Sequence, residues 1–227
     1  MMLSKEHIEN LYAFTRKHFV EYYDLQTELV DHMANDIEVI LEGDPSLSFE
    51  QARDKAFKKF GVFGFMEVVE QRAKAMNRKY AKLLWHYTKD WFRLPQIMAT
   101  ISMCLVFYTI FSFEVSSLIF VTAFLLLCFF LLYKAFKMNR KIKQKQKAKE
   151  KLWLLEDVIY RNASVGGLFL APQVFHLAYS VDGLQSYRPI ICALVFTLII
   201  IYTYVSTVVI PKNAKTHLKE TYPEYSM

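Results

Sequence analysis

The chain has 227 residues, of which 54% are hydrophobic and 22% are charged, and its formal net charge is +6. The mean hydropathy is +0.15, so the apolar residues must be concentrated in part of the chain. The three cysteines, Cys104, Cys128 and Cys192, all lie in strongly apolar stretches, a placement that excludes a disulfide framework and a zinc site of the Cys-x-x-Cys type.

Residues 1–75 have the periodicity of a small helical bundle. Mostly apolar side chains recur every three or four positions in three separate stretches, and this spacing places each set on one face of a helix. We therefore expect three helices that pack through these faces. The three sets are Ile8, Leu11, Tyr12, Thr15 and Phe19; Leu25, Leu29, Met33, Ile37 and Ile40; and Phe49, Ala52, Ala56 and Phe60.

Short signals mark where these helices begin and end. Gly43 and Pro45 break the pattern of the second helix. Ser48, followed three positions later by Gln51, has the pattern of a capping box, in which each side chain bonds the other residue's backbone N–H. Gly61 suits the position after a helix end, where the left-handed backbone conformation is common.

The second helix carries a crowded acidic stretch, "DLQTELVDHMANDIEVIL", which contains Glu28, Asp31, His32 and Asp36. A metal would need three or four convergent ligands, and the stretch lacks the repeated Glu-x-x-His of helical di-iron sites. We therefore expect neither a metal nor a catalytic role here. Two interpretations of His32 remain. It is a packing histidine at the edge of the buried face, held by Glu28 and Asp36 at four-residue spacing, or these four residues form a partner surface.

The charge changes sign after this region. Residues 1–70 carry 7 Lys and Arg against 14 Asp and Glu, a net charge of −7, whereas residues 71–95 carry 7 against 1, a net charge of +6. A longer helix from about Phe63 is expected to lead towards a membrane, with a basic amphipathic connector over residues 76–93.

Four apolar windows follow, at residues 94–113, 115–133, 162–181 and 189–210, and none contains Asp, Glu, Lys or Arg. Each has about 20 residues, the length that a helix needs to cross the hydrocarbon core of a bilayer. Four buried helices of a soluble core would have the same composition, but a chain this short could hardly bury them all. The N-terminus is charged from Lys5 onward, so we expect no cleavable signal peptide.

Basic residues decide the expected topology. The loop 134–151 carries 9 Lys and Arg against 1 acidic residue, and Lys212, Lys215 and Lys219 follow the fourth window. Because cytoplasmic segments are enriched in Lys and Arg, the connector, this loop and the tail 211–227 should lie inside, beside anionic lipid headgroups. We therefore expect an inner-membrane protein with both termini in the cytoplasm. A basic run could also bind nucleic acid, but its place between two spans favours the lipid surface.

The third window is irregular, because it contains Gly166, Gly167 and Pro172. Proline removes a backbone hydrogen bond and should kink the helix. Gln173 and His176 lie near mid-depth, and ionisable groups inside a membrane are candidates for function. A neutral histidine bonded to a backbone carbonyl or to Gln173 is the interpretation we favour, since no window holds a second charged group.

The pattern "YYDLQTELVDHMANDIE", "SFEQARDKAFKKFG" and "FMEVVEQ" resembles the small helical HAAS domain. That domain lies at the N-terminus of bacterial membrane proteins often encoded beside PadR-type transcription regulators. The sequence is most similar to multi-pass membrane proteins of Bacteroidetes type. The resemblance covers roughly residues 5–75 and rests on Glu28 to Glu38, Ser48 to Phe60 and the Phe60-Gly61 step. It implies a helical fold and a cytoplasmic partner, such as a PadR-type regulator, and it carries no catalytic residues.

The expected fold is therefore all-α: a cytoplasmic helical bundle, residues 1–75, followed by a bundle of four transmembrane helices within residues 94–210. The function we favour is non-enzymatic signalling or regulation, without a cofactor, through a protein partner of the cytoplasmic domain. The alternative is a small transporter or membrane enzyme that uses the kinked third span, with Gln173 and His176 as its site.

Overall fold

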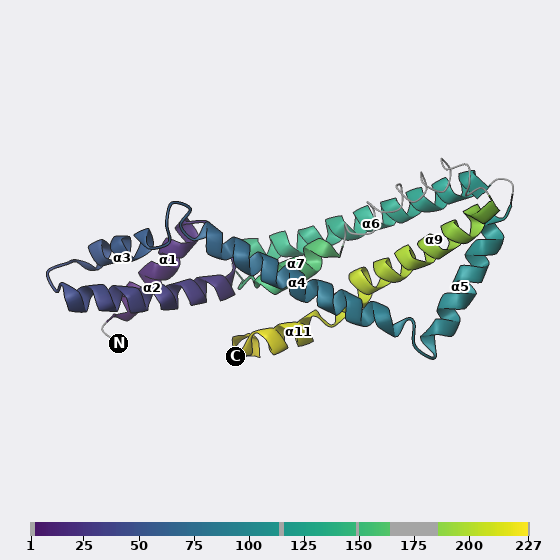
Figure 1. The fold of residues 1–227 in the computed structure, drawn as a ribbon. Helices are drawn as coiled ribbons and strands as arrows, with labels where there is room; N and C mark the ends of the chain where they lie inside the picture. Colours follow the sequence, from purple (N-terminus) through teal and green to yellow (C-terminus); the bar gives the residue numbers. More distant parts are fainter. Residues whose placement is uncertain (1–2, 114–115, 149, 164–185, 227) are drawn as a thin grey trace. The chain divides into compact units, whose positions relative to one another are not determined.

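The computed structural model describes residues 3–113, 116–148, 150–163 and 186–226, and every regular element in these ranges is a helix. This confirms the all-α prediction for the described part of the chain (Figure 1). The longer helices are α1 (Lys5–Lys17), α2 (Tyr23–Gly43), α3 (Phe49–Lys58), α4 (Met66–Asp90), α5 (Gln96–Phe111), α6 (Ser116–Lys147), α7 (Leu154–Asn162), α9 (Arg188–Tyr204) and α11 (Ala214–Thr221). The shorter ones are the π-helical η2 (Val205–Val209), α10 (Ile210–Lys212) and the 3-10 helix η3 (Pro223–Ser226).

The chain forms two compact units. The first consists of Met1–Arg78 together with Lys145–Leu155, and the second of Lys79–Gln144 together with Glu156–Met227. The expected boundary at residue 75 is close to the end of the N-terminal stretch, but α4 runs through it as one helix, so no separate connector begins at residue 76. The basic segment expected as a loop is helical as far as Lys147, because α6 continues to that residue.

Because the first unit includes residues beyond position 70, its net charge differs from the value counted over residues 1–70. It contains 14 Lys and Arg against 15 Asp and Glu, a net charge of −1, because residues 71–78 add a charge of +3 and residues 145–155 add another +3. The net charge of −7 counted over residues 1–70 therefore overstates how strongly the folded unit would be repelled by an anionic surface.

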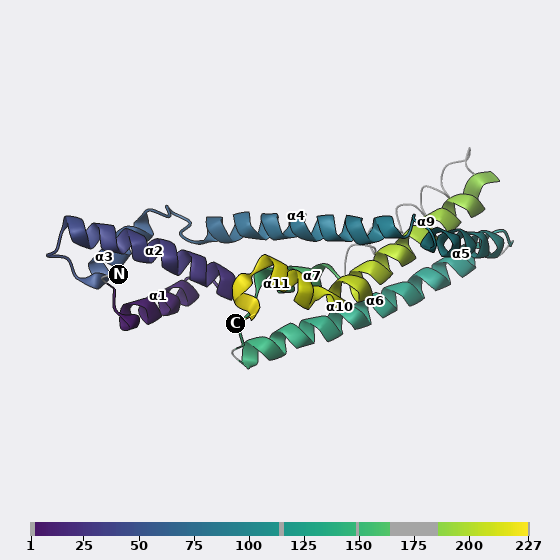
Figure 2. The ribbon, with the colours of Figure 1, turned by 90° about the horizontal axis from the view of Figure 1, so that it is seen from below.

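In the first unit, α1, α2 and α3 pack as a three-helix bundle (Figures 1 and 2). The expected stripes form its core, with Leu11, Leu29, Met33 and Ile37 almost fully buried. The predicted capping box of α3 is confirmed: the Gln51 backbone N–H donates to Ser48 Oγ at 3.3 Å, and Gln51 Oε1 accepts from the Ser48 N–H at 3.0 Å. A second capping box, between Ser4 and His7, starts α1.

An aromatic cluster joins α1 to the end of α3 and to the turn that follows. The Phe57 ring lies 4.4 Å from the His18 ring, 5.2 Å from the Phe14 ring and 4.9 Å from the Phe65 ring, measured between centroids. Burial, with Lys17 and Arg53 nearby, lowers the pKa of His18 below its usual value. The neutral ring is therefore favoured in the folded unit, and the stability it contributes is lost as the pH falls below the ordinary histidine value.

Phe19 departs from its expected place in the first stripe. Helix α1 ends at Lys17, and Phe19 is 80% exposed with φ = 65°. The Val20 N–H donates to the Thr15 carbonyl and the Phe19 N–H to the Arg16 carbonyl, both at 3.1 Å, which is the hydrogen-bond pattern of a Schellman motif. Glycine usually occupies this left-handed position, so the helix period alone places Phe19 on the wrong face.

In the second unit, α5 and α9 lie side by side and share an apolar core. The Phe196 ring lies 5.1 Å from the Phe107 ring and 5.9 Å from the Phe111 ring, and Cys192 and Ala193 are buried beside them. Cys192 therefore fills apolar space in this core.

Among the described residues, two helices are long and apolar enough to cross a membrane, at Val121–Lys145 and Arg188–Lys212. The apolar helix Gln96–Phe111 is shorter, and residues 164–185, most of the third predicted span, lie outside the described residues. The second and fourth predicted windows thus form helices with the length and composition of a membrane span, and the bundle of four membrane helices stays a prediction.

Gly64 offers a direct test of the first unit. A Cβ added there would lie 2.8 Å from Phe57 Cζ, and its φ of +53° is strained for other residues, whereas a Cβ at Gly43 would meet nothing within 4 Å. We expect Gly64→Ala to destabilise the unit by about 2 kcal/mol and Gly43→Ala to change its stability by less than about 0.5 kcal/mol. Hydrogen exchange of the α3 amides in the full chain measures the difference, and equal effects would contradict the packing described.

Candidate functional site

The acidic residues of α2 are partly used to hold the first unit together. Glu28 forms an ion pair with Arg72 of α4, and Asp36 Oδ1 lies 2.7 Å from Lys59 Nζ just after α3. Asp31 and His32 are exposed. Of the two interpretations of His32, the packing histidine held by Glu28 and Asp36 is therefore wrong, since both carboxylates face other partners. The interpretation as a partner surface stays a prediction, and Asp31 and His32 are its accessible members.

A second site lies where residues 145–155 meet the start of α2. The Tyr23 backbone N–H donates to the Leu152 carbonyl at 2.7 Å, and the Leu154 backbone N–H donates to Asp24 Oδ1 at 3.1 Å. Both donors belong to the first turn of a helix, where backbone N–H groups have no partner within the helix. Each of the two helices α2 and α7 thus receives a cap from the segment that begins the other.

Side chains reinforce this junction. Lys151 Nζ lies 4.0 Å from the centroid of the Tyr23 ring, and the Trp153 ring packs edge-on against the same ring at 5.4 Å. Trp153 is buried in this contact. A cation over an aromatic face contributes about 0.5–1 kcal/mol when exposed and more when desolvated. The junction therefore combines backbone, charge and apolar contacts around one tyrosine.

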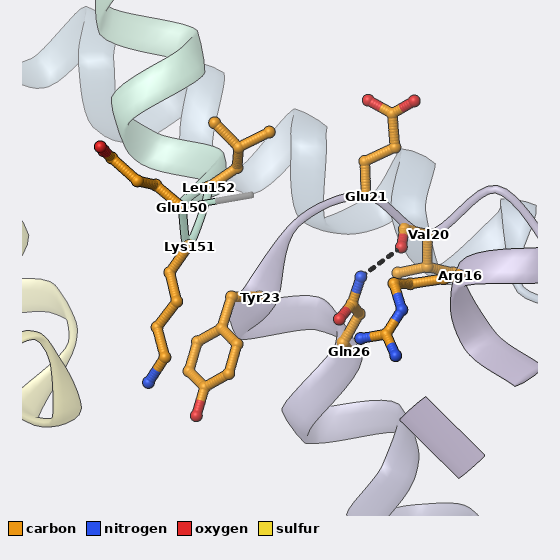
Figure 3. Close-up of a pocket in the computed structure, with 8 residues that line it drawn as sticks. All are labelled: Arg16, Val20, Glu21, Tyr23, Gln26, Glu150, Lys151 and Leu152. Carbon is orange, nitrogen blue, oxygen red and sulfur yellow. Dashed lines mark hydrogen bonds between the residues drawn. The ribbon is translucent and has the colours of Figure 1, made fainter. Parts of the chain in front are cut away.

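Figure 3 shows the pocket beside this junction, which has a volume of about 740 Å³. Gln26, buried at its wall, donates from Nε2 to the Val20 carbonyl at 2.7 Å, so its amide is fixed in place. Arg16 and Lys151 line the pocket together with Glu21 and Glu150, and the charges of the four side chains balance. Such a mixed lining would suit a zwitterionic or neutral polar group. The sequence gives no sign of the pocket, because its two walls are more than a hundred residues apart.

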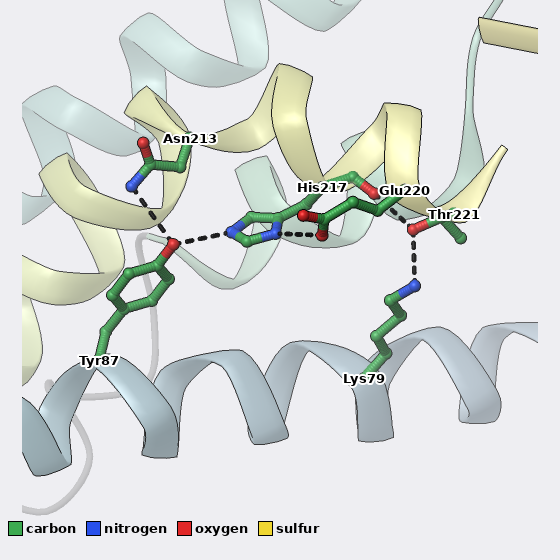
Figure 4. Close-up of polar contacts among 6 residues, drawn as sticks. All are labelled: Lys79, Tyr87, Asn213, His217, Glu220 and Thr221. Atoms are coloured by element: carbon green, nitrogen blue, oxygen red, sulfur yellow. Dashed lines mark hydrogen bonds and ion pairs between the residues drawn. The ribbon is translucent and has the colours of Figure 1, made fainter. Parts of the chain in front are cut away.

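The third site, in the second unit, is a buried histidine between α4 and α11 (Figure 4). Tyr87 Oη lies 3.1 Å from His217 Nε2, and His217 Nδ1 lies 3.3 Å from Glu220 Oε2. Asn213 Nδ2 donates to Tyr87 Oη at 3.4 Å. The carboxylate of Glu220, the imidazole of His217 and the phenol of Tyr87 thus form a row of neighbouring polar groups. Such a row can transfer a proton in general acid–base catalysis.

A neighbouring contact gives this arrangement a structural role as well. Lys79 Nζ donates to Thr221 Oγ1 at 2.6 Å, so α4 holds α11 at two points separated by eight residues of α4. Sequence reasoning missed His217, since it treated residues 211–227 as a tail. The spacing of Asn213, His217, Glu220 and Thr221, all on one face of a helix, was the signal that could have indicated it.

The intramembrane candidates Gln173 and His176 lie outside the described residues. Within the described ranges, no group of three or more His, Cys, Asp or Glu side chains is placed to hold a metal ion. Comparisons with protein-family models, curated proteins and solved structures find no match. The resemblance to the HAAS domain therefore stays a prediction from the sequence.

Substitution of Asp24 tests the junction, and substitution of His32 on the same helix is the control. Removing a helix cap costs about 1 kcal/mol, so Asp24→Ala should speed hydrogen exchange of the amides at the start of α7 about fivefold in the full chain. His32→Ala, which removes an exposed side chain, should leave that exchange unchanged. If the two variants behave alike, Asp24 does not cap α7.

Proposed function

We propose that the chain is a multi-pass protein of the bacterial inner membrane with both termini in the cytoplasm. The exposed apolar side chains of α6 support this most directly: Leu125, Leu126, Phe129 and Leu132 are all at least 60% exposed. Each such side chain stabilises a folded protein by about 1.5–3 kcal/mol when it leaves water, and a bilayer supplies the apolar surroundings that the described protein does not.

We propose further that its role is non-enzymatic signalling or regulation through a cytoplasmic protein partner of the first unit. The observation that carries this is the junction at Tyr23 and Leu152. Leu152 and Leu154, which follow the end of α6 at Lys147 by a few residues, cap α2 and are capped by it. A displacement at the end of α6 would therefore act on the N-terminal helices through the short segment between Lys147 and Leu152, which is the coupling that a membrane-linked regulator needs.

The resemblance to the HAAS domain suggests which class of protein the partner belongs to. It supports a cytoplasmic protein such as a PadR-type regulator, bound without direct contact between this chain and nucleic acid. Asp31 and His32, the exposed members of the predicted surface, lie on the face of α2 that such a partner could reach. The alternative, a transporter or membrane enzyme built on the third span, depends on Gln173 and His176.

Cysteine labelling of the full chain tests the proposed membrane topology. Single cysteines placed within residues 137–149 or the tail 211–227 should react with an impermeant reagent only from the cytoplasmic side, and cysteines within 182–187 only from outside, as the distribution of Lys and Arg requires. Labelling of these positions from the opposite sides would contradict the proposed topology.

The partner is tested with a photo-crosslinking amino acid in place of Asp31, compared with one in place of Val39, which is also exposed on α2 but lies eight residues further along. We expect a discrete crosslinked cytoplasmic protein at position 31 and none, or far less, at position 39. Equal capture at both positions would contradict a specific surface around Asp31 and His32.

A further inference from the structure

The turn between α3 and α4 presents large apolar side chains to solvent. Val62 is 98% exposed, Phe63 is 77% exposed and Met66, the first residue of α4, is 52% exposed. They occupy three of the six positions of the stretch "GVFGFM", in which Gly64 and Phe65 are buried and Phe65 packs among aromatic rings. Single exposed apolar residues are common on protein surfaces, but a contiguous group of this size marks an interaction site.

Backbone geometry holds these side chains outward. Gly61 and Gly64 have φ values of +76° and +53°, and the Gly64 N–H donates to the Gly61 carbonyl at 3.2 Å. The Phe65 ring anchors the turn, since it lies 4.9 Å from the rings of Phe57 and Phe60. The exposure of Phe63 therefore belongs to an ordered turn, and a partner that binds there loses little further conformational entropy.

The exposed side chains border a groove of about 630 Å³. Phe63, Met66 and Val69 give it apolar walls, and Glu67 and Glu70 supply two negative charges. Glu70 also pairs with Lys74 at 2.8 Å, but both side chains are about two-thirds exposed, and such surface pairs contribute little. The Glu70 carboxylate can therefore exchange this partner for another cation.

We propose that this groove binds a helical segment of the cytoplasmic partner that carries a large apolar side chain flanked by Lys or Arg. The proposal rests on the function proposed above and adds the site and the chemistry of the partner. An amphipathic helix places apolar and basic residues one turn apart, which matches the apolar walls and the two carboxylates. An anionic lipid surface fits less well, because Glu67 and Glu70 would face its phosphates.

The test uses the full chain in nanodiscs of phosphatidylcholine, which carry no net charge. The probe is a fluorescent amphipathic peptide of leucine and lysine, and its counterpart has glutamate in place of lysine. We expect the lysine peptide to bind at least tenfold more tightly than the glutamate peptide, after subtraction of binding to empty nanodiscs. Phe63→Ser should weaken binding about tenfold, because it removes the main apolar contact.

Val39→Ser is the matched control, because Val39 is also an exposed apolar residue of the first unit, at 64%. It should leave binding unchanged. The double variant Glu67→Gln, Glu70→Gln should weaken binding and reduce its dependence on salt, as expected for screened charges. Circular dichroism of each variant checks that the helices are intact, which is expected because the changed side chains are exposed.

Equal binding of the two peptides, or equal effects of Phe63→Ser and Val39→Ser, would overturn the proposal. A change in oligomeric state on Phe63→Ser would instead assign the groove to a second copy of the chain, and protection of a label at position 63 by vesicles alone would assign it to lipid. The proposed function fails separately, if the crosslinker at Asp31 captures no cytoplasmic protein. Capture there with no peptide binding would reject only the groove.

Discussion

The exchange of caps between α2 and α7 determines how the first unit is built. The Tyr23 N–H bonds the Leu152 carbonyl and the Leu154 N–H bonds Asp24, so two helix starts that are about 130 residues apart satisfy each other. The contact also brings Lys151 and Trp153 onto the ring of Tyr23, so the start of α2 and the start of α7 are held to one another by several interactions. Residues 145–155 also carry a net charge of +3, and with them the net charge of the unit is −1.

The two units also differ in how many of their apolar side chains are exposed to solvent. The first buries most of its apolar residues in a core of its own, and apart from Phe19 and Val39 its large exposed ones lie in or beside the turn at Val62 and Phe63. Helix α6 instead exposes leucine and phenylalanine side chains along its length, which is the pattern of a surface that meets lipid. In the function proposed above, the junction at Tyr23 is the part of the first unit through which an event at the membrane would reach a cytoplasmic binding surface.

Local features of the chain were predictable, and long-range ones were not. The stripes of α1 to α3 and the capping box of Ser48 and Gln51 depend on residues within a few positions of one another, so sequence spacing indicates them. Phe19 left its stripe because a Schellman motif ended the helix two residues earlier, with phenylalanine where glycine is usual. The roles of Asp24 and His217 depend on the distant segment that each contacts, and no spacing along the chain carries that information. His32 lost its expected partners because Glu28 and Asp36 pair with Arg72 and Lys59, which lie far along the chain.

Formation of a disulfide between cysteines at positions 23 and 152 tests the junction most directly. Because the Tyr23 nitrogen and the Leu152 oxygen lie 2.7 Å apart, the two Cα atoms lie within about 6.6 Å of each other, inside the range that a disulfide spans. In a chain whose Cys104, Cys128 and Cys192 are replaced by serine, Tyr23→Cys with Leu152→Cys should crosslink rapidly under mild oxidation. Tyr23→Cys with Ser46→Cys should not, because α2 separates these positions by about 30 Å. If the first pair crosslinks no faster than the second, residues 145–155 do not belong to the N-terminal unit, and the proposed coupling to α6 is lost.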